Sequence, residues 1–236
     1  MGGNNIRDLT LMDERDEIET RLKSIFEGLF TPEEIEKRKV LWKILCRDFF
    51  EKYIKENDTL LDLGAGYCEF INNVRCGKKV AVDLNTHALQ YANNDVKVII
   101  SKGTSIPEIS DESVDVVFAS NFWEHMRDRE ELKQTLKEVR RIIKRDGRLI
   151  ILQPNIRYCY KLYWDFFDHI IPLSHKSMEE ILKYMGFKIL YIKPKFLPYS
   201  TKSRWPKHPI FVKTYLKIPI LHYIFGKQML VIAGKK

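Results

Sequence analysis

The chain has 236 residues, enough for one elaborated domain and few for two, and its 44% hydrophobic and 31% charged residues are typical of a globular protein. No apolar run approaches the roughly 18 residues of a membrane-spanning helix, and the first residues resemble neither a secretory nor a myristoylation signal. We therefore expect a cytoplasmic protein. The four cysteines form no C-x-x-C pair, which argues against a zinc knuckle or a disulfide framework.

Basic residues are concentrated toward the end of the chain. Residues 157–236 hold 15 Lys and Arg against 4 Asp and Glu, and no acidic residue follows Glu180. A surplus of this kind favours an anionic partner, either phosphate, nucleic acid or a lipid head group. The alternative is that these side chains only solvate the surface.

The first part of the chain is predicted to be helical. A helical stretch over about 13–29 is followed by Thr31-Pro32-Glu33-Glu34, which combines an N-cap, a proline at the first helical position and a capping-box glutamate. The helix that begins there has one apolar face and is expected to run to about Lys55.

The pattern then changes to short apolar runs that alternate with helical segments. Nearly continuous apolar runs are typical of strands covered on both faces. The predicted strands are 59–63, 80–84, 96–100, 114–120 and 148–152. Between the last two, a helix begins at Asp128 and is expected to end at Asp146-Gly147. This alternation predicts a doubly wound α/β fold with a mostly parallel sheet.

Two further strands are predicted in the last third of the chain. Ser177-x-x-Glu180 indicates a capped helix over 178–185, and a strand follows at 187–193. The final strand, at 228–233, comes after a proline-punctuated segment, 194–227, that mixes apolar and basic residues.

Ligands of open α/β sheets bind beyond the carboxyl ends of the strands, so the residues there are site candidates. Gly64 and Gly66 follow the first strand and allow a tight turn whose main-chain N–H groups a ligand can approach. Asp83 ends the second strand, where a carboxylate can accept ribose hydroxyls. Glu69 replaces the third glycine of the dinucleotide fingerprint and disfavours a pyrophosphate, whereas Asp62 suits an ammonium group. A nucleoside joined to an amino acid, as in S-adenosylmethionine, fits this combination.

Three strings of the sequence carry a family resemblance. Leu60-Leu-Asp-Leu-Gly-Ala-Gly66, then Val82-Asp83, then Asp115-Val-Val-Phe-Ala-Ser-Asn121 with Glu124-His125, resemble the class I S-adenosylmethionine-dependent methyltransferases, in particular those described as methyltransferase type 11 or 23. The resemblance covers about 58–155. It implies a seven-stranded sheet with an antiparallel last strand, the cofactor over the first two strands and the acceptor over the fourth and fifth.

The resemblance also implies roles for individual residues around the cofactor. The glycine turn and the carboxylate before it would surround the methionine part, the acid of the second strand would hold the ribose, and the next residue would pack against the adenine. The loop after the third strand would reach the adenine amino group, and the end of the fourth would lie beside the reactive methyl. In chain order these residues are Asp62, Gly64, Gly66, Asp83, Leu84, Thr104, Ser105 and Asn121.

Two groups are candidates for work on the acceptor. His125 lies just beyond the fourth strand, and its unperturbed pKa near 6.5 suits proton removal at neutral pH, although a structural histidine bonded to backbone is the alternative. In Trp164-Asp-Phe-Phe-Asp-His169, the side chains of Asp165, Asp168 and His169 could bind a sugar, a metal or one another. No metal site is predicted, because no second ligand cluster with recognisable spacing supports one.

These inferences predict a methyltransferase that uses S-adenosylmethionine and acts at an oxygen of a small-molecule, glycan or lipid-linked acceptor. Residues 1–57 are expected to form a helical lid and 58–236 the Rossmann-like domain, in which 194–227 touches an anionic substrate or membrane surface. The basic tail keeps an RNA methyltransferase as an alternative, although Asn121-Phe-Trp-Glu replaces the Asn-Pro-Pro-Tyr-type base-flipping motif. A non-catalytic scaffold is a third possibility, and the oligomeric state is left open.

Overall fold

A computed structural model describes residues 30–199 and 209–236. Internal contacts divide the chain into residues 1–37 and residues 38–236, and the fold described below is that of the second unit. The helix predicted over about 13–29 lies outside the described residues. Within the first unit, the capping box is confirmed, because the Glu34 amide donates to Thr31 Oγ1 (3.3 Å) and the Thr31 amide donates to Glu34 Oε2 (2.9 Å).

The first described helix is shorter than predicted. Helix α2 (Pro32–Asp48) ends well before Lys55, and a 3-10 turn, η1 (Phe50–Tyr53), follows it. Phe49 leaves the helical conformation at φ −132° and ψ −52°. The chain turns there, and the fully buried Phe50 ring packs edge-on against Phe70 and Phe118. The stabilisation from burying this ring competes with continuation of the helix beyond Asp48.

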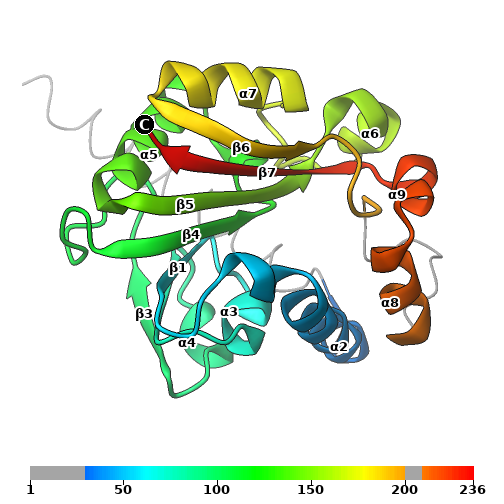
Figure 1. Cartoon of the computed structure of the whole chain (residues 1–236), viewed down its shortest axis with the longest axis horizontal. Coiled ribbons are helices and arrows are strands. Elements are labelled where there is room, and N and C mark those ends of the chain that lie inside the picture. The colour runs from blue at the N-terminus through cyan, green and yellow to red at the C-terminus, as the bar shows by residue number, and fades with distance from the viewer. Residues whose placement is uncertain (1–29, 200–208) are drawn as a thin grey trace, which may run out of the picture. The chain divides into compact units, whose positions relative to one another are not determined.

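A seven-stranded sheet in the order β3-β2-β1-β4-β5-β7-β6 forms the centre of this unit (Figure 1). The first five strands pair in parallel, and β7 runs antiparallel to both of its neighbours. The predicted mostly parallel α/β sheet with an antiparallel last strand is therefore confirmed. The strands are β1 (Thr59–Leu63), β2 (Lys78–Asp83), β3 (Val96–Ile100), β4 (Val114–Ser120), β5 (Ile143–Pro154), β6 (Phe187–Lys193) and β7 (Gln228–Lys235).

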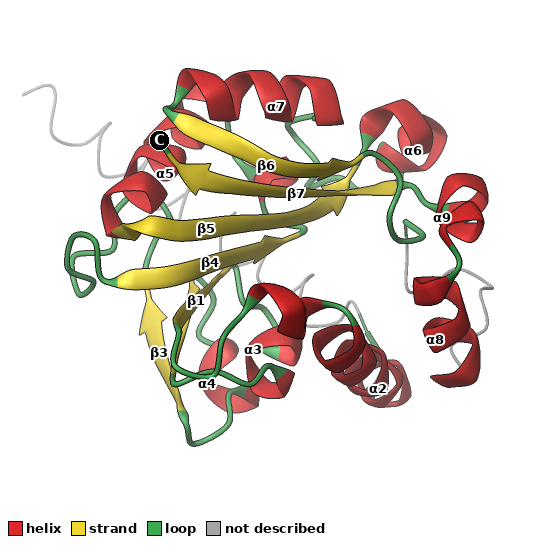
Figure 2. Cartoon of the chain, in the orientation of Figure 1, coloured by secondary structure: helices red, strands yellow, loops and turns green. Residues whose placement is uncertain are grey.

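Helices cover both faces of the sheet, as Figure 2 shows by colour. Successive strand residues face opposite sides, so Leu61 packs with the apolar residues of α5 and α7, whereas Leu60 packs with those of residues 42–50 and α3. This two-sided burial explains the nearly continuous apolar runs of the strands. The remaining helices are α3 (Glu69–Asn73), α4 (Ala88–Tyr91), η2 (Trp123–His125), α5 (Arg129–Ile142), α6 (Ile156–Tyr163), α7 (His175–Tyr184), α8 (Pro209–Lys217) and α9 (Pro219–Phe225).

Two further predicted helix boundaries are wrong. Helix α7 is capped by Ser174, whose hydroxyl accepts from the Ser177 amide, so the helix begins three residues before the predicted start at 178. Helix α5 ends at Ile142 rather than at Asp146-Gly147, because Ile143 already pairs with Val114 at the start of β5. The register shifts between Val114 and Val116, so Gly147 belongs to an irregular part of the strand pair instead of a helix end.

We predict that Gly147→Ala destabilises the fold by about 1–3 kcal/mol through overpacking. A Cβ at this buried position would lie 3.0 Å from the carbonyl oxygens of Asp115 and Lys144, and backbone cannot easily move away. Gly234→Ala in the neighbouring β7 is the matched control, since the nearest atom to its Cβ would be Leu190 Cδ1 at 3.4 Å, an ordinary contact. Urea denaturation of both variants measures the effect, and equal midpoints for the two would contradict it.

Candidate functional site

The carboxyl ends of β1, β2 and β4 meet at one edge of the sheet, where ligands of doubly wound folds bind. At this edge the turn after β1 is held close to β2, since the Gly64 amide donates to the Val82 carbonyl (2.8 Å). The backbone is left-handed at Gly64 (φ +72°), Gly66 (φ +52°) and Cys68 (φ +55°). The turn therefore has three residues in the left-handed conformation that glycine adopts without strain. Cys68 has a Cβ, so this conformation costs roughly 1–2 kcal/mol there.

The absence of a side chain at Gly64 also leaves space for Phe122, which follows β4. A Cβ on Gly64 would lie 2.4 Å from Cδ2 of Phe122, and one on Gly103, in the loop after β3, would lie 3.0 Å from Cζ of the same ring. The Phe122 ring therefore lies against both turns. It brings the loop with Thr104 and Ser105, of which the first is half-buried and the second exposed, toward the glycine turn.

Asp83 joins the turns that follow β1 and β2. Its Oδ2 accepts the Gly66 amide (2.8 Å) and its Oδ1 accepts the Asn85 amide (2.7 Å). Burial raises the pKa of Asp83, although these backbone amides oppose that shift. The carboxylate stays partly exposed and its two oxygens have about four lone-pair sites, so two further hydroxyls can bind there. The next residue, Leu84, presents an exposed apolar side chain.

A buried group of carboxylates lies beneath the glycine turn. Burial, reinforced by the charge of Asp83, raises the pKa of Asp62 well above its ordinary value. Glu69 is also buried, but Arg38 Nη2 donates to its Oε2 (2.6 Å). The sequence-based argument that Glu69 repels a pyrophosphate is therefore weakened, because its charge is matched. A cationic ligand group near Asp62 would relieve the cost of that buried carboxyl.

Asn121 directly follows β4 and is exposed. Its backbone is left-handed (φ +48°), and its backbone N–H donates to the Leu152 carbonyl (2.8 Å). Gln228 Nε2 reaches Asn121 Oδ1 at 3.4 Å, which ties this residue to the start of β7.

A second cluster joins η2 to the segment after α6. His125 Nδ1 lies 3.2 Å from Asp168 Oδ2 and 3.0 Å from the Asp168 carbonyl oxygen. The His125 and His169 ring centroids are 5.2 Å apart. The Glu124 carbonyl accepts the amides of Ile170 (2.8 Å) and Ile171 (3.0 Å), so backbone hydrogen bonds fix the segment against η2. The structure thus brings three predicted residues together from two separate parts of the chain.

The charges in this cluster are strongly coupled. Burial acts to lower the pKa of His125, but its bond to Asp168 and the charge of Glu124 outweigh burial and raise the pKa to about 9. Burial raises the pKa of Glu124 to about 7. Burial, together with the charge of His125, lowers the pKa of His169 to about 4. A ring with the pKa of His125 must lose a proton before it can act as a base at pH 7, and that role stays a prediction.

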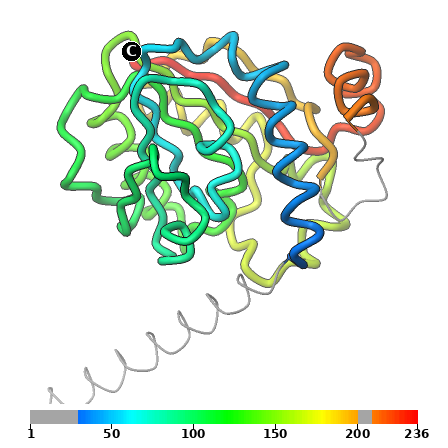
Figure 3. Tube along the Cα trace, turned by 90° about the horizontal axis from the view of Figure 1, so that it is seen from below, coloured from blue at the N-terminus to red at the C-terminus, as the bar shows by residue number. Residues whose placement is uncertain are grey.

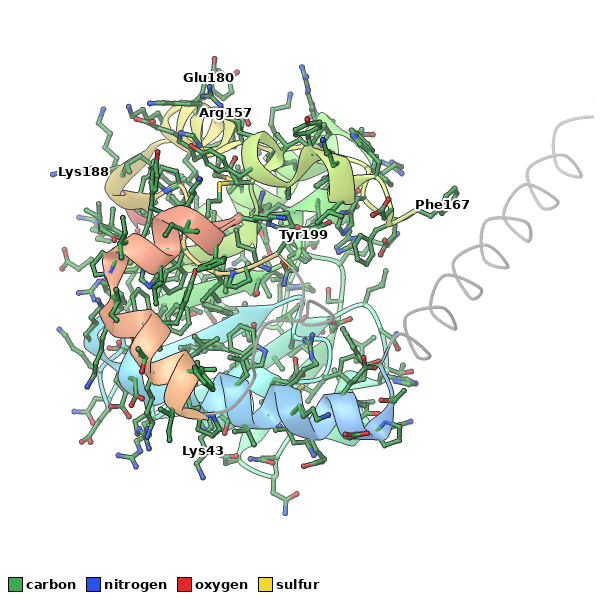
Figure 4. The ribbon with its side chains drawn as sticks, turned by 90° about the vertical axis from the view of Figure 1, so that its right-hand side faces the viewer. Lys43, Arg157, Phe167, Glu180, Lys188 and Tyr199 are labelled. Carbon is green, nitrogen blue, oxygen red and sulfur yellow. The ribbon has the colours of Figure 1, made fainter. Side chains whose placement is uncertain are left out.

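Asp165 lies outside this cluster. The 164–169 segment follows α6, and Asp165 is exposed in the turn at the helix end. The neighbouring Trp164 is 60% exposed, and the 93% exposed Phe167 projects away from the body of the protein in Figure 4. These two rings are not core residues. Phe166, by contrast, stacks on His169 at a centroid distance of 4.9 Å.

Sequence reasoning missed four side chains of the site, namely Arg38, Phe122, Glu124 and Tyr199. Only Glu124 had a visible signal, since it precedes His125 in the quoted string. Both of its oxygens are buried and have no hydrogen-bond partner among the described residues. Tyr199 OH lies 3.3 Å from His169 Nδ1 and comes from a distant part of the chain.

Comparisons with known proteins agree with this architecture. Residues 61–151 match the family model Methyltransf_11, a methyltransferase domain. An uncharacterized protein of Methanocaldococcus jannaschii is 29% identical over 139 residues, which are 58% of each chain. A second from the same organism is 29% identical over 136 residues, 54% of this chain and 63% of its own. The chain therefore matches less than two thirds of the length of either relative.

Solved structures share the fold. A SAM-dependent methyltransferase from Archaeoglobus fulgidus has a TM-score of 0.61 and 24% identity, covering 84% of this chain and 94% of its own. A chain of the complex between the Haloferax volcanii Trm112 methyltransferase activator and a methyltransferase has a TM-score of 0.65 and 16% identity, covering 90% and 96%. The predicted class I methyltransferase fold is confirmed, and residues 61–151 match the model of a methyltransferase domain. S-adenosylmethionine, the predicted cofactor, is the cofactor of such relatives.

Proposed function

We propose that this chain transfers the methyl group of S-adenosylmethionine to an oxygen of a small-molecule, glycan or lipid-linked acceptor. The observation that carries the proposal is the adjacency of two half-sites at one sheet edge. The glycine turn with Asp83 forms a half suited to a nucleoside, and the cluster of His125, Asp168 and His169 forms a polar half; Asn121 and Phe122, whose ring lies against Gly64, join them along the chain. When bound, the cofactor supplies an electrophilic methyl group on a sulfonium.

In the cofactor half, Asp83 would accept the ribose hydroxyls with the lone pairs that the backbone amides leave open. Leu84 offers an apolar surface to the adenine, and Thr104 and Ser105 lie on the loop that closes this end. Asp62, which precedes the glycine turn at the end of β1, would favour the ammonium of the methionine part, because a cation relieves the cost of its buried carboxyl.

In the acceptor half, Asp168 orients the His125 ring, and the His169 ring lies beside it. These groups would bind and orient an acceptor hydroxyl and receive its proton, since methyl transfer needs alignment and proton removal. Asp165, exposed beside Trp164 and Phe167, would contact the outer part of a polar acceptor such as a sugar.

The carboxylate of Asp83 gives the first test. We expect Asp83→Asn to weaken binding of S-adenosylhomocysteine about 10- to 100-fold, because charge-assisted hydrogen bonds contribute about 1.5–3 kcal/mol. Asp115→Asn is the matched control, since Asp115 also accepts a backbone amide, that of Thr59, but lines a cleft at the opposite edge of the sheet. Titration calorimetry decides: a parental dissociation constant for Asp83→Asn would remove the ribose assignment.

The acceptor class requires a separate experiment. We expect methyl-labelled S-adenosylmethionine and the full chain to transfer label to the small-molecule, glycan or lipid fraction of cell material in an alkali-resistant, ether-like form. Label in RNA would favour the alternative of an RNA methyltransferase. Cofactor binding with no label in any fraction would favour a scaffold without catalysis.

A basic, apolar surface on α8 and α9 supports the further proposal of contact with an anionic membrane. Val212, Tyr215 and His222 are buried, but most of the other apolar side chains of these helices are exposed. Lys213 and Lys217 lie on α8, where their charges contribute to lowering the pKa of Asp48, and no acidic residue follows Glu180. The exposed apolar residues are Ile210, Phe211, Ile218, Ile220, Tyr223, Ile224 and Phe225. Within the described residues, no helix is long and apolar enough to cross a bilayer.

We predict that the chain sediments with anionic vesicles at low salt and not with neutral vesicles or at high salt. Lys213→Gln with Lys217→Gln should reduce partitioning, since each basic residue near the surface contributes about 1 kcal/mol, or roughly fivefold. Ile220→Ser with Ile224→Ser should reduce it as well, whereas Leu89→Ser, at an exposed position of α4, should not. Absence of the parent chain from anionic vesicles at low salt would show that this surface has another role.

A further inference from the structure

We propose that Glu124, His125 and His169 bind a divalent first-row transition-metal ion, of which Zn²⁺ is the type, at the acceptor side of the sheet edge. One carboxylate oxygen and one ring nitrogen from each histidine lie within 4.8 Å of one another. Ligands about 2.0–2.2 Å from a tetrahedral ion are themselves roughly 3.3–3.6 Å apart. Small rotations of the side chains therefore bring the three atoms onto one ion without movement of the backbone.

The Glu124 carboxylate is an independent indication of a cation. Its side chain is only 1% exposed, and neither Oε1 nor Oε2 has a hydrogen-bond partner among the described residues. A buried carboxyl that lacks hydrogen bonds is costly, and such groups in folded proteins require an explanation such as a bound water or ion. An ion on Glu124 compensates the buried charge directly, whereas a structural role in packing would favour an apolar residue of this size.

Both histidines are oriented for coordination. His125 Nδ1 is engaged by Asp168 (3.2 Å to Oδ2), and His169 Nδ1 is engaged by the hydroxyl of Tyr199 (3.3 Å). We therefore assign Nε2 of each ring to the ion. Metal-binding histidines have this arrangement, in which the second nitrogen is bonded to a carboxylate or another polar group that fixes the ring.

The two halves of the cluster are also fixed relative to each other. The backbone amides of Ile170 and Ile171 both donate to the Glu124 carbonyl, at 2.8 and 3.0 Å. The residue that supplies the carboxylate thus holds the segment that supplies His169. The ligands are consequently positioned by backbone hydrogen bonds rather than by mobile side chains alone.

The types of ligand atom at the site determine which ions fit it and what a bound ion can do. Two imidazoles and one carboxylate suit Zn²⁺, Mn²⁺, Fe²⁺ and Co²⁺, whereas Mg²⁺ prefers oxygen ligands. Three protein ligands leave at least one position open, as in catalytic rather than structural sites. We assign this open position to the acceptor oxygen, an assignment that rests on the proposed function. The ion would lower the pKa of the acceptor hydroxyl before methylation. This assignment revises the sequence-based expectation of no metal.

Metal binding can be measured without cofactor or acceptor. The full chain, treated with chelator and dialysed, is titrated with Co²⁺ and with Zn²⁺, and bound metal is counted by mass spectrometry. We expect one equivalent, a Co²⁺ visible spectrum of nitrogen and oxygen coordination, and a rise in Tm of about 5–10 °C at a hundredfold excess over Kd. Glu124→Gln and His169→Ala should each weaken binding at least tenfold, and Asp168→Asn about 10- to 100-fold.

Asp165→Asn is the matched control, because Asp165 lies in the same segment but outside the cluster. The Asp165→Asn variant should bind Co²⁺ with the affinity of the parent. The apo form of Glu124→Gln should be at least as stable as the apo parent, since it loses a buried charge, so weak binding cannot be attributed to misfolding. The proposal is wrong if the parent binds S-adenosylhomocysteine but no stoichiometric Zn²⁺ or Co²⁺, or if Glu124→Gln and His169→Ala retain parental affinity.

Discussion

The arrangement of the sheet edge depends on the close approach of Phe122 to Gly64. A side chain at Gly64 would overlap the ring, and the left-handed backbone there also turns the Gly66 amide toward Asp83. The missing Cβ of Gly64 permits the contact of β1 with the end of β4, and the missing Cβ of Gly103 permits the contact of the loop after β3 with the same ring. The half-site that we assign to the cofactor lies where all three strand ends meet. Its geometry follows from sterics at the turn and not from the chemistry of the ligand.

This constraint also explains which features could be predicted from the sequence. The strand runs and Gly64, Gly66 and Asp83 are local patterns with a fixed spacing, and the parallel α/β order then brings them to one edge. The end of α2 could not be predicted in the same way, because burial of Phe50 against Phe70 and Phe118 is a tertiary effect. The early start of β5 likewise depends on pairing with Val114.

The acceptor cluster was predictable only in part. His125, Asp168 and His169 were candidates by residue type, but their contact depends on the two amides that bind the Glu124 carbonyl. No spacing rule connects η2 with the segment after α6. Glu124 was not predicted, because nothing in the sequence indicates that this glutamate beside a histidine is buried. Its isolation from hydrogen-bond partners is visible only when the surrounding core is known.

Tyr199 connects the cluster of His125, Asp168 and His169 to the start of β7. Its hydroxyl lies 3.3 Å from His169, and its carbonyl accepts Gln228 Nε2 (3.1 Å) at the start of β7. Figure 3 shows α8 and α9 as a pair next to that end of β7, and Figure 1 places them at the same end of the sheet as the carboxyl ends of β4 and β5. A surface that holds the protein on an anionic bilayer would therefore lie on the same side as the acceptor half. An acceptor with an apolar anchor could reach His125 and His169 without leaving the membrane surface, whereas a freely diffusing acceptor would gain nothing from this placement. The location of the two surfaces thus favours the lipid-linked member of the proposed acceptor classes.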